Sequence, residues 1–251
     1  MLHLTLITGA SRGLGAAMAA LRLRQGHHVI GISRQASAEL AALAATGNAL
    51  LTQWKLDLAE PEAAANQLAT WLTAQDGKTF ASVTLINNAG VVTQPGPLEG
   101  TPLAEVSRGM RVGLEAALSL SAAFLLGTAA WPGPRKLLNI SSGLGRRAMA
   151  GSAVYCAAKA GMDHFARAVA LEQAALPNGA RIVSLAPGII DTDMQAQLRS
   201  ADPAAFPEGE RFAQFKSQGQ LDTPEVAAAK VLAYLDRADF GANPVGDVRD
   251  A

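Results

Sequence analysis

The chain has little of what would tie it to an oxidising compartment or to a metal. Its single cysteine, Cys156, excludes an internal disulfide, and the N-terminus runs into a strand-like segment with no basic leader. A cytoplasmic location is therefore expected. The four histidines are scattered without the spacing of metal ligands, so no metal site is expected; they are His3, His27, His28 and His164.

An excess of charge of either sign is also absent. The 21 basic and 21 acidic side chains cancel, which gives no general attraction for nucleic acid or for an anionic membrane surface. No run of about 18 uncharged apolar residues occurs, because Arg108, Arg111 and Glu115 interrupt the longest candidate. The expected partner is a small molecule, with no nucleic acid and no membrane.

Short apolar runs alternate with alanine-rich stretches from one end of the chain to the other. That alternation is typical of βαβ units around a parallel sheet, and 251 residues are enough for one such domain. The predicted fold is a single-domain, doubly wound α/β sheet of Rossmann type with helices on both faces. Strands are expected at 2–8, 29–33, 50–56, 83–87, 136–141 and 181–186, and helices at 13–25, 36–46, 60–75, 102–130, 152–175 and 223–236.

Residues 191–222 differ from the rest in being rich in Gln, Asp, Arg, Pro and Phe. They lie between the last predicted strand and the last predicted helix. In doubly wound sheets ligands bind outside the carboxyl ends of the strands, where such excursions form lids. A lid is therefore expected here, and its apolar side chains either line the pocket or simply pack beneath the loop; these are Met194, Phe206, Phe212 and Phe215.

A glycine cluster follows the first predicted strand and opens the first helix. Gly9 permits a tight turn, Gly13 lets the backbone approach a pyrophosphate, and Gly15 allows the helix to pack closely on the strand. The helix N-terminus favours an anion. The cluster predicts a dinucleotide phosphate site, although a glycine-rich turn without a ligand has the same local pattern.

Tyr155 and Lys159 lie four residues apart, which places both on one face of a helix. A free phenol has a pKa of about 10, so it needs a nearby positive charge to exchange a proton near neutral pH. Such a pair suits a carbonyl reductase or an alcohol dehydrogenase. On its own the spacing is a weak indication, because a solvated helix face carries it equally well.

Taken together, these motifs resemble the short-chain dehydrogenase/reductase family. The resemblance covers nearly the whole chain and rests on five motifs, each at or just beyond the carboxyl end of a predicted strand. Besides the glycine cluster, they are Asn87-Asn88-Ala89-Gly90, Ile140-Ser141-Ser142, Tyr155 with Lys159, and Pro187-Gly188.

The resemblance implies a role for each member of a catalytic group. Ser142, thirteen residues before Tyr155, would hydrogen-bond the substrate carbonyl. Tyr155 would donate a proton to that oxygen as hydride arrives at carbon. Lys159 would lower the pKa of the phenol and bind the nicotinamide ribose. A serine that merely caps a turn is the alternative for Ser142.

The segment after the second strand indicates the cofactor. NAD enzymes of this fold carry a carboxylate there, whereas the 2′-phosphate of NADP needs cations. This chain has Ser33 and Arg34 there and Arg12 in the glycine cluster, so NADP(H) is expected; the alternative is a pair of solvated arginines. Residues 1–251 would then form one NADP-binding oxidoreductase domain. The cofactor-binding residues implied are Gly9, Ser11, Arg12, Gly13, Leu14, Gly15, Ser33, Arg34, Asp57, Asn88, Ala89, Gly90, Tyr155, Lys159, Pro187, Gly188, Ile190, Thr192 and Met194.

The last third of the chain narrows the resemblance. Residues 186–195 and 215–221, with Asp239-Phe240, are similar to sepiapterin reductase and to its bacterial relatives that reduce benzil and other α-diketones. This similarity implies reduction of a ketone next to a second carbonyl, and an aspartate that anchors the substrate; Asp247 is either that residue or a polar residue of a last edge strand. The substrate-binding residues implied are Ser142, Tyr155, Gly188, Met194 and Asp247.

Two other functions stay open. One is an alcohol dehydrogenase or 3-oxoacyl reductase that acts on another ketone. The other is a catalytically silent, NADP-binding regulatory protein, which a single departure from the family pattern favours. The family has an asparagine in the long central helix that supports a water beside the lysine, and this chain has Gly113. We expect the glycine to leave room for a further water and so to preserve the proton relay.

The long central helix also bears on assembly. The family forms dimers or tetramers, often through this helix and the catalytic helix, which carries Tyr155 and Lys159. Residues 102–130 are rich in alanine and leucine on more than one face, which is typical of burial against a partner. A homodimer or homotetramer is therefore expected.

Overall fold

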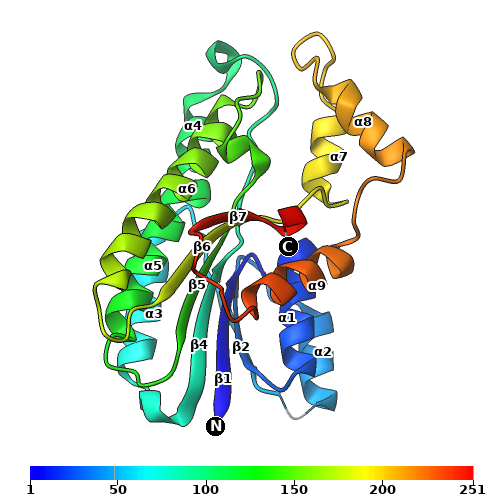
Figure 1. Ribbon diagram of the computed structural model, residues 1–251. Helices are drawn as coiled ribbons and strands as arrows, with labels where there is room; N and C mark the ends of the chain where they lie inside the picture. Colours follow the sequence, from blue (N-terminus) through cyan, green and yellow to red (C-terminus); the bar gives the residue numbers. More distant parts are fainter. Residues whose placement is uncertain (48, 251) are drawn as a thin grey trace.

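We describe the protein from a computed structural model that covers residues 1–47 and 49–250. Its strands are β1 (Leu2–Thr8), β2 (His28–Ser33), β3 (Leu51–Lys55), β4 (Phe80–Asn87), β5 (Arg135–Ile140), β6 (Arg181–Ala186) and β7 (Val245–Asp247). Within the described residues these seven parallel strands form one sheet in the order β3-β2-β1-β4-β5-β6-β7 (Figure 1). The first six match the strands expected from the sequence, and β7 adds an edge strand.

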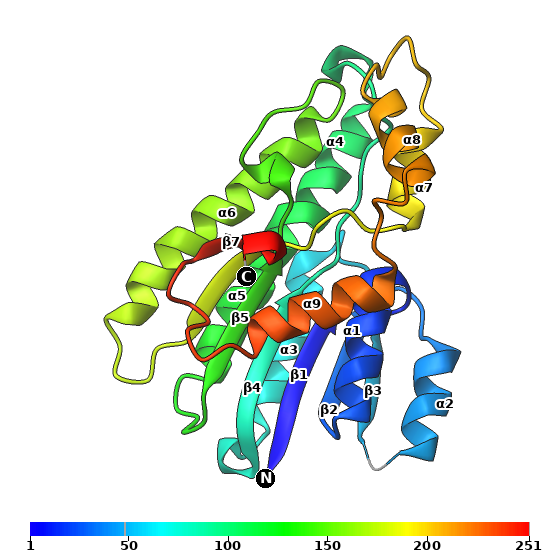
Figure 2. The same cartoon turned by 45° about the vertical axis from the view of Figure 1, so that its right-hand side comes forward.

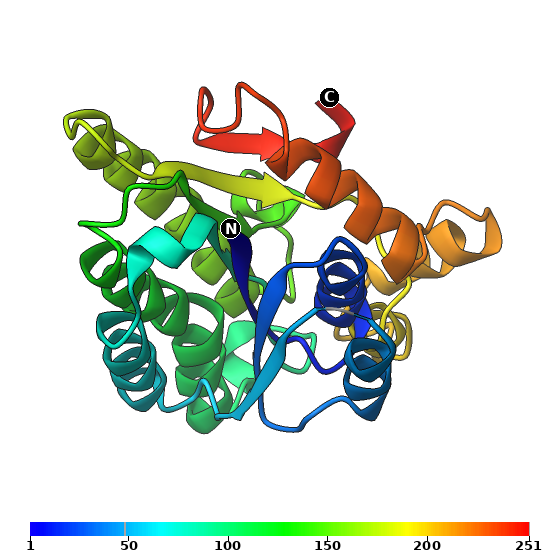
Figure 3. The same ribbon diagram turned by 90° about the horizontal axis from the view of Figure 1, so that it is seen from below.

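Helices cover both faces of the sheet, as Figure 3 shows from below. One face is covered by α1 (Gly13–Arg24), α2 (Ala38–Thr46) and α9 (Pro224–Leu235). The other is covered by α3 (Pro61–Thr73), α5 (Ala116–Gly127) and α6 (Ala153–Ala174). The predicted doubly wound parallel sheet is confirmed.

The continuous apolar runs of the strands follow from this burial on both faces. Successive side chains of a strand point to opposite faces, and in β1 both Leu6 and Ile7 are fully buried. Leu6 packs in the core under α3 and α5, and Ile7 packs in the core under α1 and α9. A sheet covered on both faces therefore needs apolar residues at consecutive positions.

The long helix predicted over 102–130 is one helical run, Leu103–Gly127, with a change of pitch in the middle. α4 (Leu103–Met110) passes through a π-helical turn, η3 (Arg111–Glu115), into α5. By length and composition alone this run could span a membrane, and 44% of its most apolar stretch is buried. That is a weak indication, since a helix packed inside a folded protein passes the same test, and α5 here packs along α3.

Residues 191–222 lie above the carboxyl ends of the strands (Figures 1 and 2). They contain two helices, α7 (Asp193–Arg199) and α8 (Gly209–Ser217). A parallel bridge between Ile190 and Asp222 joins the two ends of the segment. The segment is therefore a closed excursion from the sheet, in the position that a lid requires.

The excursion has a small apolar core of its own. Phe206 and Phe212 stack with their ring centres 5.9 Å apart, and Leu198 of α7 and Met149 of the loop before α6 complete the cluster. Gly151 in that loop has a φ of +73°, and a Cβ there would lie only 2.7 Å from the Phe206 ring. The lid segment thus packs directly on the loop that leads into α6.

Candidate active site

A cavity of about 1030 Å³ opens at the carboxyl ends of the strands, beneath the lid segment. Its wall is built by the turn after β1, the ends of β2, β4, β5 and β6, the start of α6, and α7. Every residue that the sequence predicts to bind cofactor or substrate lines this cavity. Residues spread over most of the chain are therefore brought into one site.

The glycine cluster has the backbone geometry of a close-approach loop. Gly9 and Gly13 have φ values of +68° and +56°, a region that favours glycine. A Cβ on Gly15 would lie 2.2 Å from the carbonyl oxygen of Gly9 and 2.6 Å from Nδ2 of Asn88. The absence of side chains is what lets α1 start against the end of β1.

Hydrogen bonds fasten this loop to the end of β4. Oγ1 of Thr8 accepts from the backbone N–H groups of Asn88 and Ala89, both at 2.9 Å, and Nδ2 of Asn88 donates to the carbonyl of Thr8 at 2.9 Å. Sequence patterns indicate no role for Thr8, whose hydroxyl accepts from two backbone N–H groups beyond the end of β4. The turn after β1 is thus tied to the segment that follows β4.

The loop and its surroundings fit a dinucleotide. α1 begins at Gly13 without a capping side chain from Arg12, so N–H groups of its first turn face the cavity, where a phosphate binds well. Ser33, the last residue of β2, and Arg34, which follows it, also line the cavity, and Arg34 is exposed. Asp57 lies beyond β3, and its Oδ1 accepts from the N–H of Ala59 at 3.0 Å.

Arg12 has a partner that the sequence did not indicate. Its Nη1 donates to Oδ2 of Asp193, the first residue of α7, at 2.8 Å. Both side chains are about three-quarters exposed (73% and 76%), so the pair contributes little to stability. Arg12 therefore links the glycine cluster to the lid segment, and a phosphate would compete with Asp193 for it.

Ser142, Tyr155 and Lys159 come together on one side of the cavity. Ser142 follows the end of β5, and its hydroxyl accepts from the N–H of Leu144 at 3.2 Å, which caps the short turn η4 (Gly143–Gly145). The same hydroxyl lies close enough to the Tyr155 phenol to lower its pKa. Nζ of Lys159 lies 5.6 Å from the centre of the phenol ring and donates to the carbonyl of Ile140 at 2.6 Å. Ser142 thus both caps a turn and contacts the phenol.

Burial sets the protonation of this group. Burial raises the pKa of Tyr155 to about 12, partly offset by the hydrogen bond with Ser142. Burial lowers the pKa of Lys159 to about 8, partly offset by the nearby Asp163 carboxylate. In the protein alone the pKa of the phenol is therefore raised and not lowered, because burial dominates. Near neutral pH the phenol holds its proton and is a donor.

Gly113 does not leave the open space that the sequence suggested. It lies in the π turn η3, is buried, and a Cβ built on it would lie 3.2 Å from Cβ of Ala158 on α6. That approach is tighter than ordinary van der Waals contact. The expectation of extra room at this position is corrected: the glycine lets the central helix pack closely against α6, one residue before Lys159.

The substrate side of the cavity lies beneath the lid segment. Gly188 and Met194 line it, as do Phe212 and Phe215 from α8. Phe206 is fully buried in the core of the lid segment and is not part of the wall. Of the two alternatives left open for these side chains, three of the four line the cavity and Phe206 packs beneath the loop.

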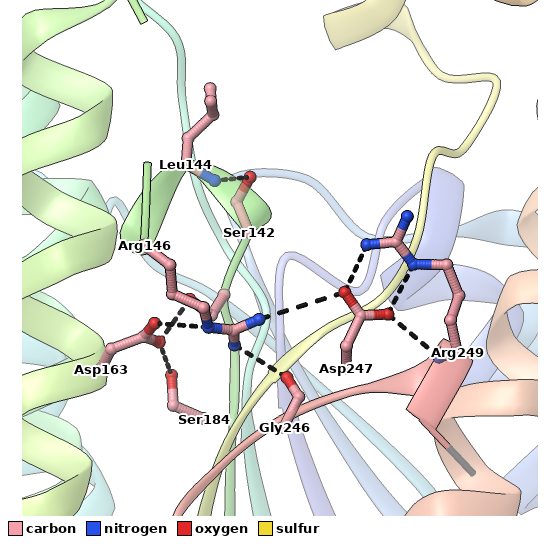
Figure 4. Close-up of polar contacts among 9 residues, drawn as sticks. Ser142, Leu144, Arg146, Asp163, Ser184, Gly246, Asp247 and Arg249 are labelled. Carbon is pink, nitrogen blue, oxygen red and sulfur yellow. Dashed lines mark hydrogen bonds and ion pairs between the residues drawn. The ribbon is translucent and has the colours of Figure 1, made fainter. Parts of the chain in front are cut away.

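Asp247 ends the edge strand β7, and its place in the cavity wall is also compatible with a substrate-binding role. Its side chain is buried, and Arg249 holds both carboxylate oxygens, Nε donating to Oδ1 at 2.7 Å and Nη2 to Oδ2 at 2.6 Å (Figure 4). These hydrogen bonds keep the pKa of Asp247 below its usual value. A substrate group would have to compete with Arg249 for this carboxylate.

The sequence missed a second buried carboxylate, Asp163. It lies on α6 one turn beyond Lys159, and its Oδ1 accepts from the hydroxyls of Ser141 at 2.5 Å and Ser184 at 2.7 Å. The signal was present, because Tyr155, Lys159 and Asp163 continue the same four-residue spacing along one helix face. Its importance depends on β6, which no local pattern connects to α6.

Across residues 1–47 and 49–250, no group of three or more His, Cys, Asp or Glu side chains is placed to hold a metal ion. His3 and His27 stack with ring centres 5.0 Å apart. His3 lies at the amino-terminal end of β1, and His27 immediately precedes β2. Both therefore lie at the end of the strands opposite the cavity.

Comparison with known proteins identifies a matching family profile, two related sequences and one related structure. A sequence profile described as short chain dehydrogenase matches residues 3–203. The chain is 35% identical to benzil reductase ((S)-benzoin forming) of Bacillus subtilis (strain 168), over 94% of each chain, and 31% identical to sepiapterin reductase of Rattus norvegicus, over 93% of this chain and 91% of that one. A Beutenbergia cavernae structure with bound NADP at low occupancy matches with a TM-score of 0.81 and 28% identity, over 98% of this chain and 94% of that chain.

Proposed function

Because this chain belongs to the short-chain dehydrogenase/reductase family, we propose that it is an NADPH-dependent carbonyl reductase. Its substrate is a ketone next to a second carbonyl, and Tyr155 is the proton donor. The observation that carries the proposal is the meeting of Ser142, Tyr155 and Lys159 in the same cavity as the glycine cluster.

The preference for NADPH rests on charge at the end of β2. Ser33, Arg34 and Gln35 line the cavity there, and none of them is acidic. A carboxylate at this place would favour the free ribose 2′-hydroxyl of NAD, whereas a guanidinium attracts a 2′-phosphate. Arg12 lies in the same wall and gives a second cation once it leaves Asp193.

The substrate class rests on the relatives and on the cavity wall. Benzil reductase and sepiapterin reductase are the names of two relatives that match over more than nine-tenths of this chain. Met194, Phe212 and Phe215 give the substrate side an apolar surface beneath the lid segment, which suits a diketone with aromatic or alkyl substituents.

The residues of the chain carry the proton chemistry. When bound, the nicotinamide cofactor supplies a hydride. Ser142 hydrogen-bonds the ketone oxygen, and Tyr155 gives its proton to that oxygen as negative charge develops there. Lys159, fixed by the carbonyl of Ile140, stabilises the phenolate that Tyr155 becomes. With a pKa of about 8, its ammonium form predominates near neutral pH.

A substrate panel tests the proposal. The protein is mixed with NADPH and, in separate assays, with benzil, sepiapterin, a 3-oxoacyl thioester and a simple ketone, and the loss of NADPH absorbance is followed. Turnover of a diketone supports the proposal. Turnover of the simple ketone or the thioester alone favours an alcohol dehydrogenase or a 3-oxoacyl reductase, and tight NADPH binding without turnover favours a regulatory protein. Sepiapterin turnover undiminished in Asp247→Ala would remove the substrate role of that residue.

We also propose that the protein works as a homodimer or homotetramer. Leu103 on α4, Leu126 on α5 and Leu171 on α6 are 86%, 80% and 76% exposed, and a partner would cover them. Light scattering after size-exclusion chromatography measures the mass. A monomer of 25.9 kDa at high concentration would contradict the proposal.

A further inference from the structure

Asp163 is a buried carboxylate to which the reaction described above gives no task. It is 1% exposed, and burying a carboxylate is costly unless its charge and its oxygens are matched. Two hydroxyls donate to its Oδ1, from Ser141 at the end of β5 and from Ser184 in β6. One side chain of α6 thus holds two neighbouring strands at the edge of the active site.

Arg146 supplies the opposite charge. Its Nε lies 3.3 Å from Oδ2 of Asp163, an oxygen for which no hydrogen-bond donor with good geometry lies in the described part of the chain. The loop that carries Arg146 is pressed onto the helix, since a Cβ on Gly145 would lie 2.8 Å from that oxygen and 2.9 Å from the carbonyl of Lys159. The loop at Gly145 therefore packs against both the Asp163 carboxylate and the backbone of Lys159.

The chain of charges continues to the last strand. Nη2 of Arg146 donates to the carbonyl of Gly246 at 2.8 Å, and its Nη1 lies 4.0 Å from Oδ2 of Asp247 (Figure 4). Asp247 is in turn held by Arg249. Negative and positive side chains alternate from α6 through the loop after β5 to β7, and Asp163 is the member that lies on the catalytic helix.

We propose that Asp163 is a positioning residue, which keeps buried Lys159 in its ammonium form and fixes the end of β5, with Ser142, against α6. The role rests on the proposed function only in what Lys159 and Ser142 do for the substrate. The electrostatic part belongs to the protein alone and is measurable without turnover.

The direction of the effect follows from the titratable and charged groups around Lys159. On α6 these are Tyr155, Cys156 and Asp163. Arg146 comes from the loop after η4. β5 contributes the carbonyl of Ile140. Asp163 raises the pKa of Lys159 against the effect of burial. Neutralising Asp163 therefore lowers the pKa of Lys159 further. Removing Arg146 leaves the Asp163 carboxylate less compensated and so raises the pKa of Lys159.

The experiment titrates Lys159 directly by NMR of lysine Cε in the protein without ligands, with the signal assigned by its loss in Lys159→Arg. Asp163→Asn keeps the side-chain shape and removes the charge. We expect the midpoint to fall by roughly one pH unit or more. Ser184→Ala is the matched control, which removes a hydrogen bond from the same oxygen and leaves the charge, so its midpoint should stay in place.

Arg146→Gln keeps the test decisive if Asp163→Asn fails to fold. Its midpoint should move upward, and an unchanged or lower midpoint would overturn the proposal. So would an unchanged midpoint in folded Asp163→Asn, or an equal shift in Ser184→Ala.

Turnover gives an independent readout. In Asp163→Asn the alkaline limb of kcat/KM should move to lower pH, so the loss of activity is larger above the midpoint than below it, whereas a merely structural role lowers activity equally at all pH values. If no carbonyl compound is reduced but the Lys159 midpoint shifts as expected, the proposed function fails and the role of Asp163 stands.

Discussion

Lys159 donates a hydrogen bond of 2.6 Å to the carbonyl of Ile140, which ends β5 two residues before Ser142. Helix α6 and strand β5, which leads to the serine, are thus joined at the ammonium group itself. Since Lys159 is 4% exposed, its protonation is governed by this buried setting and not by solvent.

The first prediction concerns pH. Burial lowers the pKa of Lys159 to about 8, so its ammonium form predominates below that value and is lost as the pH rises through it. Because kcat/KM for the ketone reports on the enzyme before the ketone binds, we expect it to fall as the pH rises through about 8. The profile is measured at saturating NADPH in overlapping buffers. A plateau that continues well above this pH would show that the ammonium is not required.

The second prediction concerns cofactor choice. Arg34→Asp replaces the exposed cation after β2 with a carboxylate. Loss of a charged hydrogen bond to a 2′-phosphate corresponds to roughly a 10- to 100-fold rise in the KM for NADPH, while the KM for NADH falls. Arg24→Asp is the control, since it makes the same charge change at the end of α1, away from the cavity. Equal effects of the two variants would show that Arg34 acts only through the net charge of the protein and not through a contact with the 2′-phosphate.

The third prediction concerns the glycine cluster. In Gly15→Ala the new Cβ would meet the carbonyl of Gly9 at 2.2 Å, so the turn after β1 must open. NADPH binding, followed by fluorescence, should be lost or weakened by at least roughly tenfold. Gly100→Ala is the control, because a Cβ there meets nothing within 4 Å. Unchanged affinity in Gly15→Ala would mean that this turn does not hold the cofactor.

The fourth prediction concerns Gly113. An asparagine there presses on Ala158, and overpacking of this kind costs about 1–3 kcal/mol of the free energy of unfolding. Gly113→Asn should therefore be less stable in urea and should not gain turnover. In a double-mutant cycle, Ala158→Gly should recover part of the loss. A more stable and much faster Gly113→Asn enzyme would instead mark the native glycine as a defect in the proton relay.

Local patterns made much of the fold and part of the site predictable from sequence. The six main strands could be placed because each is a short apolar run with turn residues after it, and the spacing of Tyr155 and Lys159 needs only a helix. Ser142 and the glycine cluster lie where strands end, so the parallel sheet brings them to the same edge. The catalytic residues and the glycine cluster line the same cavity.

Contacts that depend on packing between distant segments were beyond the sequence. The approach of Gly113 to Ala158 is set by how two helices cross, and the pair of Arg12 with Asp193 is set by where the lid segment folds back. Asp163 continues the spacing of Tyr155 and Lys159, but its role could not be predicted from that spacing, because it depends on a hydrogen bond from Ser184 in β6. The higher pKa of Tyr155 could not be foreseen because it depends on burial.

The central claim is that Tyr155 donates the proton in an NADPH-dependent ketone reduction, and Tyr155→Phe tests it most directly. The variant keeps the ring and removes only the hydroxyl. We expect its kcat for the best diketone to fall by roughly 10²- to 10⁴-fold, with the dissociation constant for NADPH unchanged within about twofold, since the ring stays beside Lys159. Turnover by Tyr155→Phe at a rate close to that of the native protein, with NADPH bound normally, would contradict the account.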